Sequence, residues 1–351
     1  MLTASAFRAI VSGQRRGLDA AVLRCGFRLL EFPYTWAVRC RNRAFDNGRK
    51  TIHQVGVPVI SVGNLTMGGT GKTPLVAWLA RWIADQGKRV AIASRGYGTK
   101  SGQPNDEALE LADRLPSISH TQNRNRVAAA NAAIHEHRAE CILLDDGFQH
   151  RQLARDLDLV LLDALEPFGY EHVFPRGALR EPVAGLARAD VVVLSRADAI
   201  DEQDRQQIRH RVKQLSPQAD WVEISHRPLE LINSSGETEA IGSFAQKPVA
   251  AFCGIGNPRG FRHTLESISY DVAAWREFPD HFSFDEADLD SLRDWIRTTE
   301  CEAAVCTHKD LVKLNVDRLD DIPLWAVKID VEFLTGKELL VTRVSEPLAL
   351  L

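Results

Sequence analysis

A glycine-rich loop between a strand and a helix sets the architecture expected of this chain. Residues 57–64 (VPVISVGN) are mostly apolar and predict a buried strand, and the loop 65–73 (LTMGGTGKT) follows directly. A helix is predicted over 74–86, because apolar residues recur there at helical spacing and Pro74 suits a first turn. In such a unit, loop N–H groups and the helix N-terminus bind phosphate oxygens. The sequence therefore predicts a phosphate-binding loop (P-loop).

Each position of this loop has an expected role. The backbone N–H groups would come from Gly68, Gly69, Thr70 and Gly71. Lys72 would reach the β- and γ-phosphates of a nucleotide, and the Thr73 hydroxyl would bind Mg²⁺. The strict motif G-x-x-x-x-G-K-[ST] needs glycine at position 66, where this chain has Thr66. The alternative is an incidental glycine-rich turn, but three glycines in four positions before Lys-Thr favour the P-loop.

The rest of the chain alternates strands and helices. Continuous apolar strands are predicted over 89–94, 141–145, 157–163 and 190–195, with helices over 126–137 and 201–215. Residues 99–126 lack clear periodicity and predict a long loop with short elements. A polar stretch, 233–240, precedes a second set of strands (249–253, 272–274, 303–307, 324–329) and helices (258–268, 285–298). We therefore expect an α/β protein with a mostly parallel sheet and a second, smaller α/β domain.

These patterns divide the chain into four parts. Residues 1–50 form a basic amphipathic segment, and 51–232 form the P-loop domain. Residues 241–335 form the smaller α/β domain, and 336–351 are a C-terminal segment without an assigned place.

An acidic pair follows one of the buried strands. Asp145 and Asp146 end the run beginning at Cys141. A P-loop protein needs a carboxylate at the end of a neighbouring strand to hold Mg²⁺ and its water. The alternative is a plain turn, because Asp-Gly is a common turn pair. The P-loop upstream favours the metal role for both carboxylates.

The positive charge of the chain is concentrated at its start. The whole chain has a formal charge of −4, yet residues 1–50 hold ten basic and three acidic residues. Large apolar residues lie between the arginines of 18–43, as in segments that lie in a membrane interface. Pro33 is expected to break this segment into two short helices. The alternative is an ordinary helix packed on the body. We expect no secretory signal, no spanning helix and no nucleic-acid partner.

The cysteines show no pattern of a metal or disulfide site. The chain has six: Cys25, Cys40, Cys141, Cys253, Cys301 and Cys306. No two of them form a C-x-x-C pair, and most lie in apolar runs. We interpret them as reduced core residues of a cytosolic protein.

Several further motifs occur in a fixed order with the P-loop. They are SVGNLTMGGTGKTP (61–74), SRGYG (94–98), NDE (105–107), LLDDGFQHRQL (143–153), LREP (179–182), FCGIGNPRGF (252–261), FPDH (278–281) and THKDLVKL (307–314). With this set, the chain resembles the tetraacyldisaccharide 4'-kinase family of lipid A biosynthesis from about residue 18 to about residue 330. The resemblance implies a P-loop kinase domain with a smaller α/β domain.

The resemblance also implies an activity and a location. The family phosphorylates the 4'-hydroxyl of a tetraacylated glucosamine disaccharide 1-phosphate with MgATP. It acts as a peripheral protein on the cytoplasmic face of the bacterial inner membrane, docked through its N-terminal segment. The expected cofactors are therefore ATP and Mg²⁺. The expected partners are the lipid substrate and an anionic membrane surface contacted by 1–50, with no obligate protein partner.

The resemblance assigns the site residues one motif at a time. Lys72 and Thr73 match the phosphate-binding and Mg²⁺-binding residues, and Asp145 and Asp146 match the metal-associated pair. Asp106 matches the acid taken as the catalytic base, and His281 matches the histidine thought to pair with it from the second domain. Domain closure would then assemble the site. Arg180 and Glu181 match an Arg-Glu pair near the nucleotide, and Gln149 and His150 lie beside the metal loop, all four without firm roles.

The chain departs from the family pattern at three of these motifs. Asn105 replaces a glycine before the expected base, so the local turn is expected to differ. Phe282 stands where the family often has a second histidine, which removes any role of that imidazole. His308 stands where the family more often has glutamate.

Two other functions compete with this interpretation. GTPases of the metal-delivery or signal-recognition type share the Gly-Gly-x-Gly-Lys-Thr loop and need a guanine-reading N/T-K-x-D motif. Residues 195–198 (Ser-Arg-Ala-Asp) are a degenerate form of that motif at a suggestive place. The third possibility is a non-catalytic nucleotide-sensing scaffold. The acids at positions 106, 145 and 146 argue against the scaffold, which needs neither a base nor a metal pair.

Overall fold

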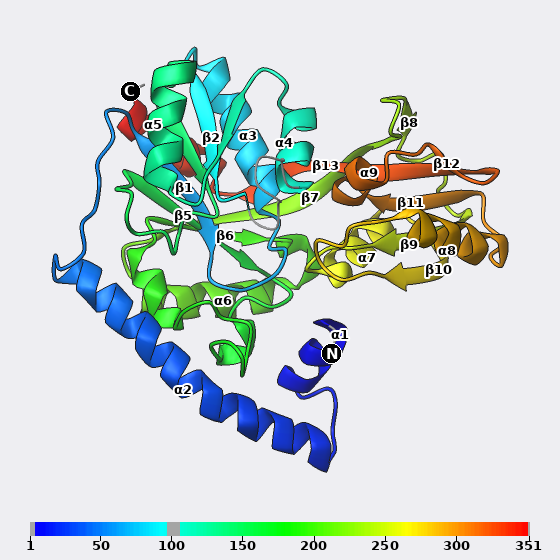
Figure 1. Ribbon diagram of the computed structural model, residues 1–351, viewed down its shortest axis with the longest axis horizontal. Coiled ribbons are helices and arrows are strands. Elements are labelled where there is room, and N and C mark those ends of the chain that lie inside the picture. The colour runs from blue at the N-terminus through cyan, green and yellow to red at the C-terminus, as the bar shows by residue number, and fades with distance from the viewer. Residues whose placement is uncertain (1–3, 97–105, 350–351) are drawn as a thin grey trace. The chain divides into compact units, whose positions relative to one another are not determined.

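The computed structural model describes residues 4–96 and 106–349 (Figure 1). The chain forms two compact units. The first unit comprises residues 1–96, 116–225 and 333–351, and the second comprises 97–115 and 226–332. The chain thus passes between the units four times. Gly98 of the SRGYG stretch and Asn105 of the NDE stretch lie outside the described residues.

The first unit contains a parallel sheet. Its strands are β1 (Val59–Asn64), β2 (Val90–Ser94), β3 (Ser119–Gln122), β4 (Cys141–Asp145), β5 (Leu157–Asp163), β6 (Val191–Ser195) and the start of β7 (Asp220–Ile232). Their order is β7-β6-β5-β1-β4-β2-β3, and every pair in this series is parallel. The prediction of a mostly parallel α/β protein is confirmed. Strands β1, β2, β4, β5 and β6 are buried throughout, which explains their continuous apolar runs.

The strand order of this sheet reverses at β1. The next strand along the chain, β2, lies beyond β4 on one side, and β5 lies on the other. In open α/β sheets, ligands bind outside the carboxyl ends of the strands at such a switch point. The P-loop follows β1 there, and Asp145 ends β4. The topology therefore brings the two predicted motifs to one edge of the sheet.

Helices cover this sheet. They are α3 (Lys72–Asp85), α5 (Arg126–His137), α6 (Glu202–Leu215) and α10 (Lys337–Leu348), with short 3₁₀ helices η1 (Gly169–Glu171), η2 (Val183–Arg188) and η3 (Ala197–Ala199). One core joins α5 to β2 and β4 through Ala129, Ala130 and Ala133. Another packs Leu186 of η2 and Val212 of α6 against β5 and β6. The second half of α10 also buries Val344 and Leu348, a segment for which the sequence predicted no place.

The basic N-terminal segment forms α1 (Ala4–Val11) and α2 (Leu18–Asp46). The expected break at Pro33 is wrong, because α2 runs through that residue without interruption. Contacts on both sides of Pro33 hold the helix on the first unit. Before it, Glu31 accepts a hydrogen bond from the Val173 N–H (2.9 Å), and after it, Asp46 pairs with Arg151 (2.6 Å). These contacts offset a cost of about 3 kcal/mol for proline inside a helix.

Two cysteines of α2 are not core residues, contrary to expectation. Cys25 and Cys40 are exposed, because they lie on the outer face of the helix. Cys141, Cys253 and Cys306 are buried, and all six cysteines are free. No helix among residues 4–96 and 106–349 is long and apolar enough to cross a membrane.

The second unit is also α/β. Its elements are α4 (Asp106–Arg114), the end of β7, β8 (Thr238–Ala240), β9 (Pro248–Cys253), α7 (Pro258–Ser267), β10 (Asp271–Glu277), α8 (Glu286–Arg297), β11 (Ala303–Thr307), α9 (His308–Leu314), β12 (Arg318–Leu319) and most of β13 (Ile322–Thr335). Parallel pairs join β10, β9, β11 and β13, while β8 and β12 add antiparallel edges. Helices α7 and α8 each pack into a core of this unit through Leu265 and Leu292.

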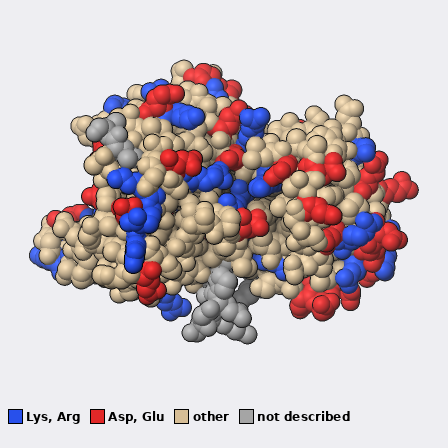
Figure 2. Space-filling view, turned by 90° about the horizontal axis from the view of Figure 1, so that it is seen from above, with Lys and Arg blue, Asp and Glu red and all other residues tan. Residues whose placement is uncertain are grey.

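Helix α8 carries many of the acidic side chains on the surface of the second unit. Figure 2 shows acidic side chains, interspersed with basic ones, on the part of the second unit where Figure 1 labels α8 and β12. Helix α8 alone carries four acids (Glu286, Asp288, Asp290, Asp294), and Asp285 and Asp288 form a capping box at its start. The acids of α8 therefore supply part of the negative charge that offsets the basic residues of 1–50.

Candidate active site

The P-loop of the first unit has the geometry of an anion-binding turn. Gly68 and Gly71 have φ values of +110° and +78°, a region that side chains with a Cβ adopt rarely. Lys72 begins α3, and its Nζ donates to Asn64 Oδ1 (3.2 Å) and lies 3.3 Å from Asp146 Oδ1. Thr66 forms a bridge with Leu179 and is buried. Residue 66 therefore pairs with the segment around Leu179, and a Cβ at position 66 is tolerated in this arrangement.

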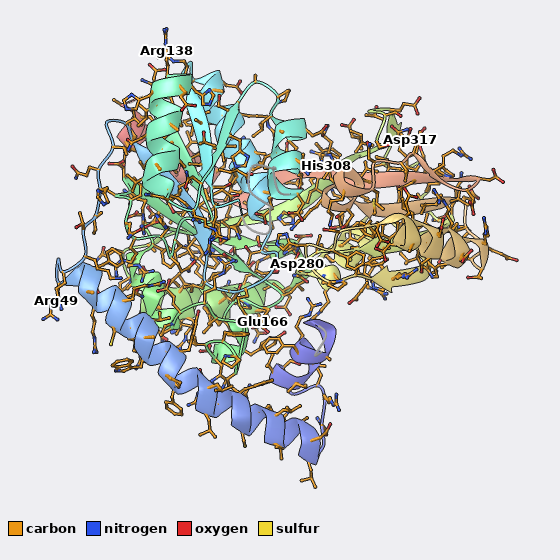
Figure 3. The ribbon with its side chains drawn as sticks, viewed as in Figure 1. Arg49, Arg138, Glu166, Asp280, His308 and Asp317 are labelled. Carbon is orange, nitrogen blue, oxygen red and sulfur yellow. The ribbon has the colours of Figure 1, made fainter. Side chains whose placement is uncertain are left out.

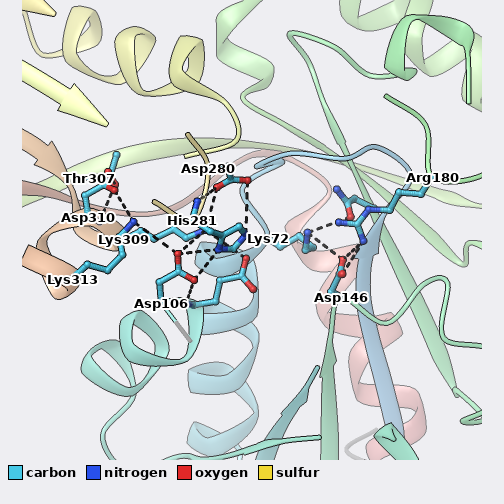
Figure 4. A network of polar contacts seen from close by, with 12 residues as sticks. Lys72, Asp106, Asp146, Arg180, Asp280, His281, Thr307, Lys309, Asp310 and Lys313 are labelled. Carbon is cyan, nitrogen blue, oxygen red and sulfur yellow. Dashed lines mark hydrogen bonds and ion pairs between the residues drawn. The ribbon is translucent and has the colours of Figure 1, made fainter. Parts of the chain in front are cut away.

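Asp146 lies at the centre of the polar network in the first unit (Figure 4). Its backbone is left-handed (φ +54°), and both of its oxygens lie 2.8 Å from Arg180 Nη1. Burial would raise the pKa of Asp146, but the charges of Lys72 and Arg180 outweigh it and hold that pKa well below the usual range. The carboxylate is therefore ionised. Asp146 thereby neutralises the charge of Lys72, as a bound phosphate group would do.

Arg126 is a residue of this network that sequence reasoning missed. It is buried at the start of α5, and the charges of Asp146 and Asp145 both act on it. Burial still lowers the pKa of Arg126 below its usual value. The only signal in the sequence was an arginine at the first position of a predicted helix, which usually means a solvated side chain. Its position adds a second arginine to the P-loop edge of the sheet.

Glu181 forms a separate buried cluster next to this network. It is fully buried, and its Oε1 accepts hydrogen bonds from Arg188 Nη2 (2.8 Å) and Gln149 Nε2 (3.1 Å). Asn42 of α2 donates to its Oε2 (2.8 Å). Gln149 also donates to the Asn64 carbonyl at the end of β1 (2.9 Å). Gln149 and Glu181 therefore connect α2 to the strand that carries the P-loop, and Arg180 contacts Asp146 itself.

The residues at this edge fit a magnesium nucleotide. Lys72, Arg180 and Arg126 supply positive charge, while Thr73, Asp145 and Asp146 supply the hard oxygen ligands that Mg²⁺ prefers. Asp145 is buried at the carboxyl end of β4, where its register partner on β1 is Val62. Among the described residues, no group of three or more histidine, cysteine or acidic side chains forms a preformed metal site. Such a group is not required, because Mg²⁺ in P-loop proteins takes ligands from the nucleotide as well.

A second network lies in the second unit around Asp106. His281 Nδ1 is 3.0 Å from both carboxylate oxygens of Asp106, which begins α4. We expected these residues to come from different domains. That is wrong, because 97–115 belongs to the second unit, where α4 packs against α9. The pair is thus assembled within one unit.

The surroundings of this pair fix its protonation. Burial raises the pKa of Asp106, but the His281 hydrogen bond and the nearby Lys309 charge lower it to about 2. An ionised carboxylate only accepts hydrogen bonds, so His281 Nδ1 carries the proton and donates it. The same hydrogen bond raises the pKa of His281. His281 has a left-handed backbone (φ +58°), and its N–H donates to Asp280 Oδ1 (3.1 Å).

Two lysines of α9 complete this network, and sequence reasoning missed both (Figure 4). Lys309 Nζ lies 3.4 Å from Asp106, 3.6 Å from Asp280 and 3.8 Å from Glu107. Lys313 Nζ lies 3.0 Å from the fully buried Asp310 and 4.0 Å from Asp106. The available signal was the THKDLVKL stretch, in which the two lysines are spaced one helical turn apart. It gave no indication of which acids they would meet.

The two remaining departures from the family pattern have structural roles. His308 is buried, and its Nε2 lies 3.0 Å from Asp113 of α4 (Figure 3). It therefore joins α9 to α4. Phe282 packs against Phe278 and Phe284 with ring centroids about 5 Å apart. This aromatic cluster holds the loop that carries His281.

The fold and the first of these networks define a class of protein. A P-loop follows β1, an acidic pair stands at the end of β4, and Lys72 and Arg180 both contact Asp146 of this pair, as in nucleotide-dependent phosphotransferases of the P-loop class. The family model for tetraacyldisaccharide-1-P 4'-kinase (LpxK) matches residues 23–348. The chain belongs to this family and is a kinase.

Individual relatives agree with this assignment. A tetraacyldisaccharide 4'-kinase of Anaeromyxobacter sp. (strain Fw109-5) is 37% identical over 357 residues, covering 96% of this chain and 95% of that protein. One from Halothermothrix orenii is 35% identical and covers 88% and 87%. The crystal structure of an LpxK from Aquifex aeolicus in complex with ATP matches with a TM-score of 0.68 and 29% identity. It covers 92% of this chain and 99% of that one. These matches favour the kinase over the GTPase and the scaffold.

Proposed function

We propose that this kinase transfers the γ-phosphate of MgATP to the 4'-hydroxyl of a tetraacylated glucosamine disaccharide 1-phosphate. The observation that carries the proposal is the family match over residues 23–348, since the relatives bear the name of that activity. The Lys72–Asp146–Arg180 network supports it with the chemistry that binding of a nucleotide phosphate requires. The structure solved with ATP supports the choice of nucleotide.

The residues of the first unit would bind and neutralise the nucleotide. The N–H groups of residues 68–71 and the Lys72 ammonium would hold phosphate oxygens, and Arg180 would add charge beside them. Thr73, Asp145 and Asp146 would hold Mg²⁺. When bound, Mg²⁺ supplies further neutralisation of the charge on the transferring phosphoryl group. Gln149 and Glu181 would position this edge, because they connect β1 to α2.

Asp106 would accept the proton of the lipid hydroxyl. His281 and Lys309 keep its carboxylate ionised and oriented, and an ionised carboxylate in hydrogen-bonding reach can act as a general base. Phosphoryl transfer needs little covalent work from the protein, so placing and orienting this acceptor is a large part of what the second unit would contribute.

Helix α2 would hold the enzyme at the cytoplasmic face of the bacterial inner membrane. Five large apolar residues on one side of α2 are 61–88% exposed: Leu18, Val22, Leu29, Phe32 and Trp36. Their spacings of 3, 4 and 7 place them in one stripe. Side chains project from the outer side of α2 in Figure 3. Arg28, Arg39 and Arg43 border this stripe and are exposed, which suits anionic headgroups.

Transfer of label from [γ-³²P]ATP to detergent-dispersed tetraacyldisaccharide 1-phosphate tests the activity. Wild type is expected to label the lipid, and Asp146→Ala is expected to lose at least 100-fold in rate. Asp85→Ala, which changes an exposed acid at the end of α3 outside the network, serves as the control and should keep the rate. Absence of labelled lipid, with phosphate released faster from GTP than from ATP, would instead favour the GTPase.

Flotation with phosphatidylglycerol vesicles tests the membrane role. Phe32→Ser/Trp36→Ser should reduce the bound fraction severalfold, because both side chains belong to the apolar stripe. Ile52→Ser is the matched control, since Ile52 is an exposed apolar residue outside α2. Equal binding of both variants and wild type would rule out the stripe as the docking surface.

A further inference from the structure

The Ser-Arg-Ala-Asp stretch at 195–198 contacts the P-loop directly. Ser195 ends β6 and is fully buried. Its Oγ donates to the Thr70 carbonyl oxygen (2.7 Å) and lies 3.2 Å from the Leu162 carbonyl oxygen. A P-loop carbonyl is therefore held by a side chain that projects from a strand of the sheet.

Arg196 makes a parallel contact one residue further on. Its backbone is left-handed (φ +52°), and its Nη1 donates to the Gly69 carbonyl oxygen (3.3 Å). The same nitrogen donates to Asp163 Oδ2 (2.6 Å) at the end of β5, and both charged side chains are more than nine-tenths buried. The guanidinium is thus fixed by an internal ion pair and cannot turn outward to contact a nucleotide base.

Peptide geometry gives these two contacts a consequence for the loop. In a planar trans peptide, the C=O of one residue and the N–H of the next point in opposite directions. Anchoring the Gly69 carbonyl therefore orients the Thr70 N–H, and anchoring the Thr70 carbonyl orients the Gly71 N–H. Glycines at 68, 69 and 71 leave the loop few restraints of its own. The restraint has to come from outside the loop.

We infer that Ser195 and Arg196 are positioning residues that turn the carbonyls of Gly69 and Thr70 away from the bound phosphates. The N–H groups of Thr70 and Gly71 are then aimed at the phosphates before the nucleotide arrives. The stretch that resembles a guanine-reading motif serves the phosphate end of the nucleotide and does not select its base. This inference rests on the proposed function only for the identity of the ligand as a nucleoside triphosphate.

Calorimetric titration with the Mg²⁺ complexes of β,γ-methylene-ATP and β,γ-methylene-GTP tests it. Ser195→Ala is expected to raise the Kd for the ATP analogue at least threefold. Arg196→Met/Asp163→Asn, which removes the buried pair together, is expected to raise it more than tenfold, and Arg196→Lys should recover part of the loss. The ratio of the ATP and GTP affinities should stay at its wild-type value in every variant.

The matched control removes another Arg–Asp pair of the first unit. Arg343 of α10 lies 3.0 Å from Asp220 of β7, and Arg343→Met/Asp220→Asn should bind the analogues as wild type does.

Wild-type Kd values in both Ser195→Ala and Arg196→Met/Asp163→Asn would overturn the inference. An equal loss of affinity in the control variant would overturn it as well. A changed ATP-to-GTP ratio would overturn it in favour of base reading. If the double variant does not fold, Ser195→Ala decides. Weakened analogue binding by an enzyme that leaves the lipid unphosphorylated would uphold this inference while refuting the proposed function.

Discussion

Lys309 lies within 4 Å of three carboxylates, those of Asp106, Glu107 and Asp280. Its charge is one reason why the pKa of Asp106 is lowered to about 2. We predict that Lys309→Met raises the pKa of Asp106, so the carboxylate becomes protonated at a higher pH. The acid limb of the kcat/KM profile should therefore move to higher pH, with a larger fall between pH 5 and pH 3 than in wild type. Initial rates of lipid phosphorylation across that range measure it.

The other charges facing Asp106 are His281 and Lys313, and they remain in this variant. Lys309→Arg keeps the positive charge and should keep the wild-type profile, which separates electrostatics from packing. If Lys309→Met only scales the rate by the same factor at every pH, the lysine does not act through the protonation of Asp106.

At the level of single elements, α2 contains a proline, Pro33, in its interior. Pro33 lacks the N–H that would bond the Leu29 carbonyl, and its side chain is exposed. We predict that Pro33→Ala stabilises α2, by up to about 3 kcal/mol in the local opening free energy. Hydrogen exchange of the α2 amides measures this. Thr35→Ala, a substitution on the same helix that restores no hydrogen bond, should change it by less than about 0.7 kcal/mol. Faster exchange in Pro33→Ala would show that the proline is needed for the bound path of the helix.

At the level of the whole molecule, the two units should respond differently to nucleotide. A ligand that binds only the folded state stabilises it by about 2.7 kcal/mol at 100 times its Kd. The P-loop residues lie in the first unit, so we predict that β,γ-methylene-ATP with Mg²⁺ slows hydrogen exchange in β1, α3 and β4. Strands β9 and β11 should change less. Lys72→Ala should abolish the protection. Protection confined to the second unit would place the nucleotide elsewhere.

Much of the sheet could be predicted because its strands are buried on both faces. The expected limits of 141–145, 157–163 and 303–307 coincide with β4, β5 and β11, since burial leaves one uninterrupted apolar run. The long strands β7 and β13 were missed or shortened for the opposite reason. About half of β7 and most of β13 are partly buried or exposed, so polar residues interrupt the pattern.

The site was predicted where its chemistry is local in sequence. The P-loop, Asp145 and Asp146 each belong to a short motif. Asp106 and His281 were named only through the family resemblance, and Lys309 was not named at all. Their meeting depends on α4 packing against α9, about 200 positions away in the chain. No local pattern encodes such a contact.

The return of the chain to the first unit at residues 333–351 bears on how the protein is made. Helix α10 buries Leu340, Val344 and Leu348 in that unit, and Phe333 packs against Trp78 of α3 (4.7 Å between ring centroids). Domains generally fold as they leave the ribosome, the N-terminal one first. Here the unit that starts first is also the last to be completed. The nascent P-loop must therefore stay on an unfinished fold until residues 333–351 have been synthesised.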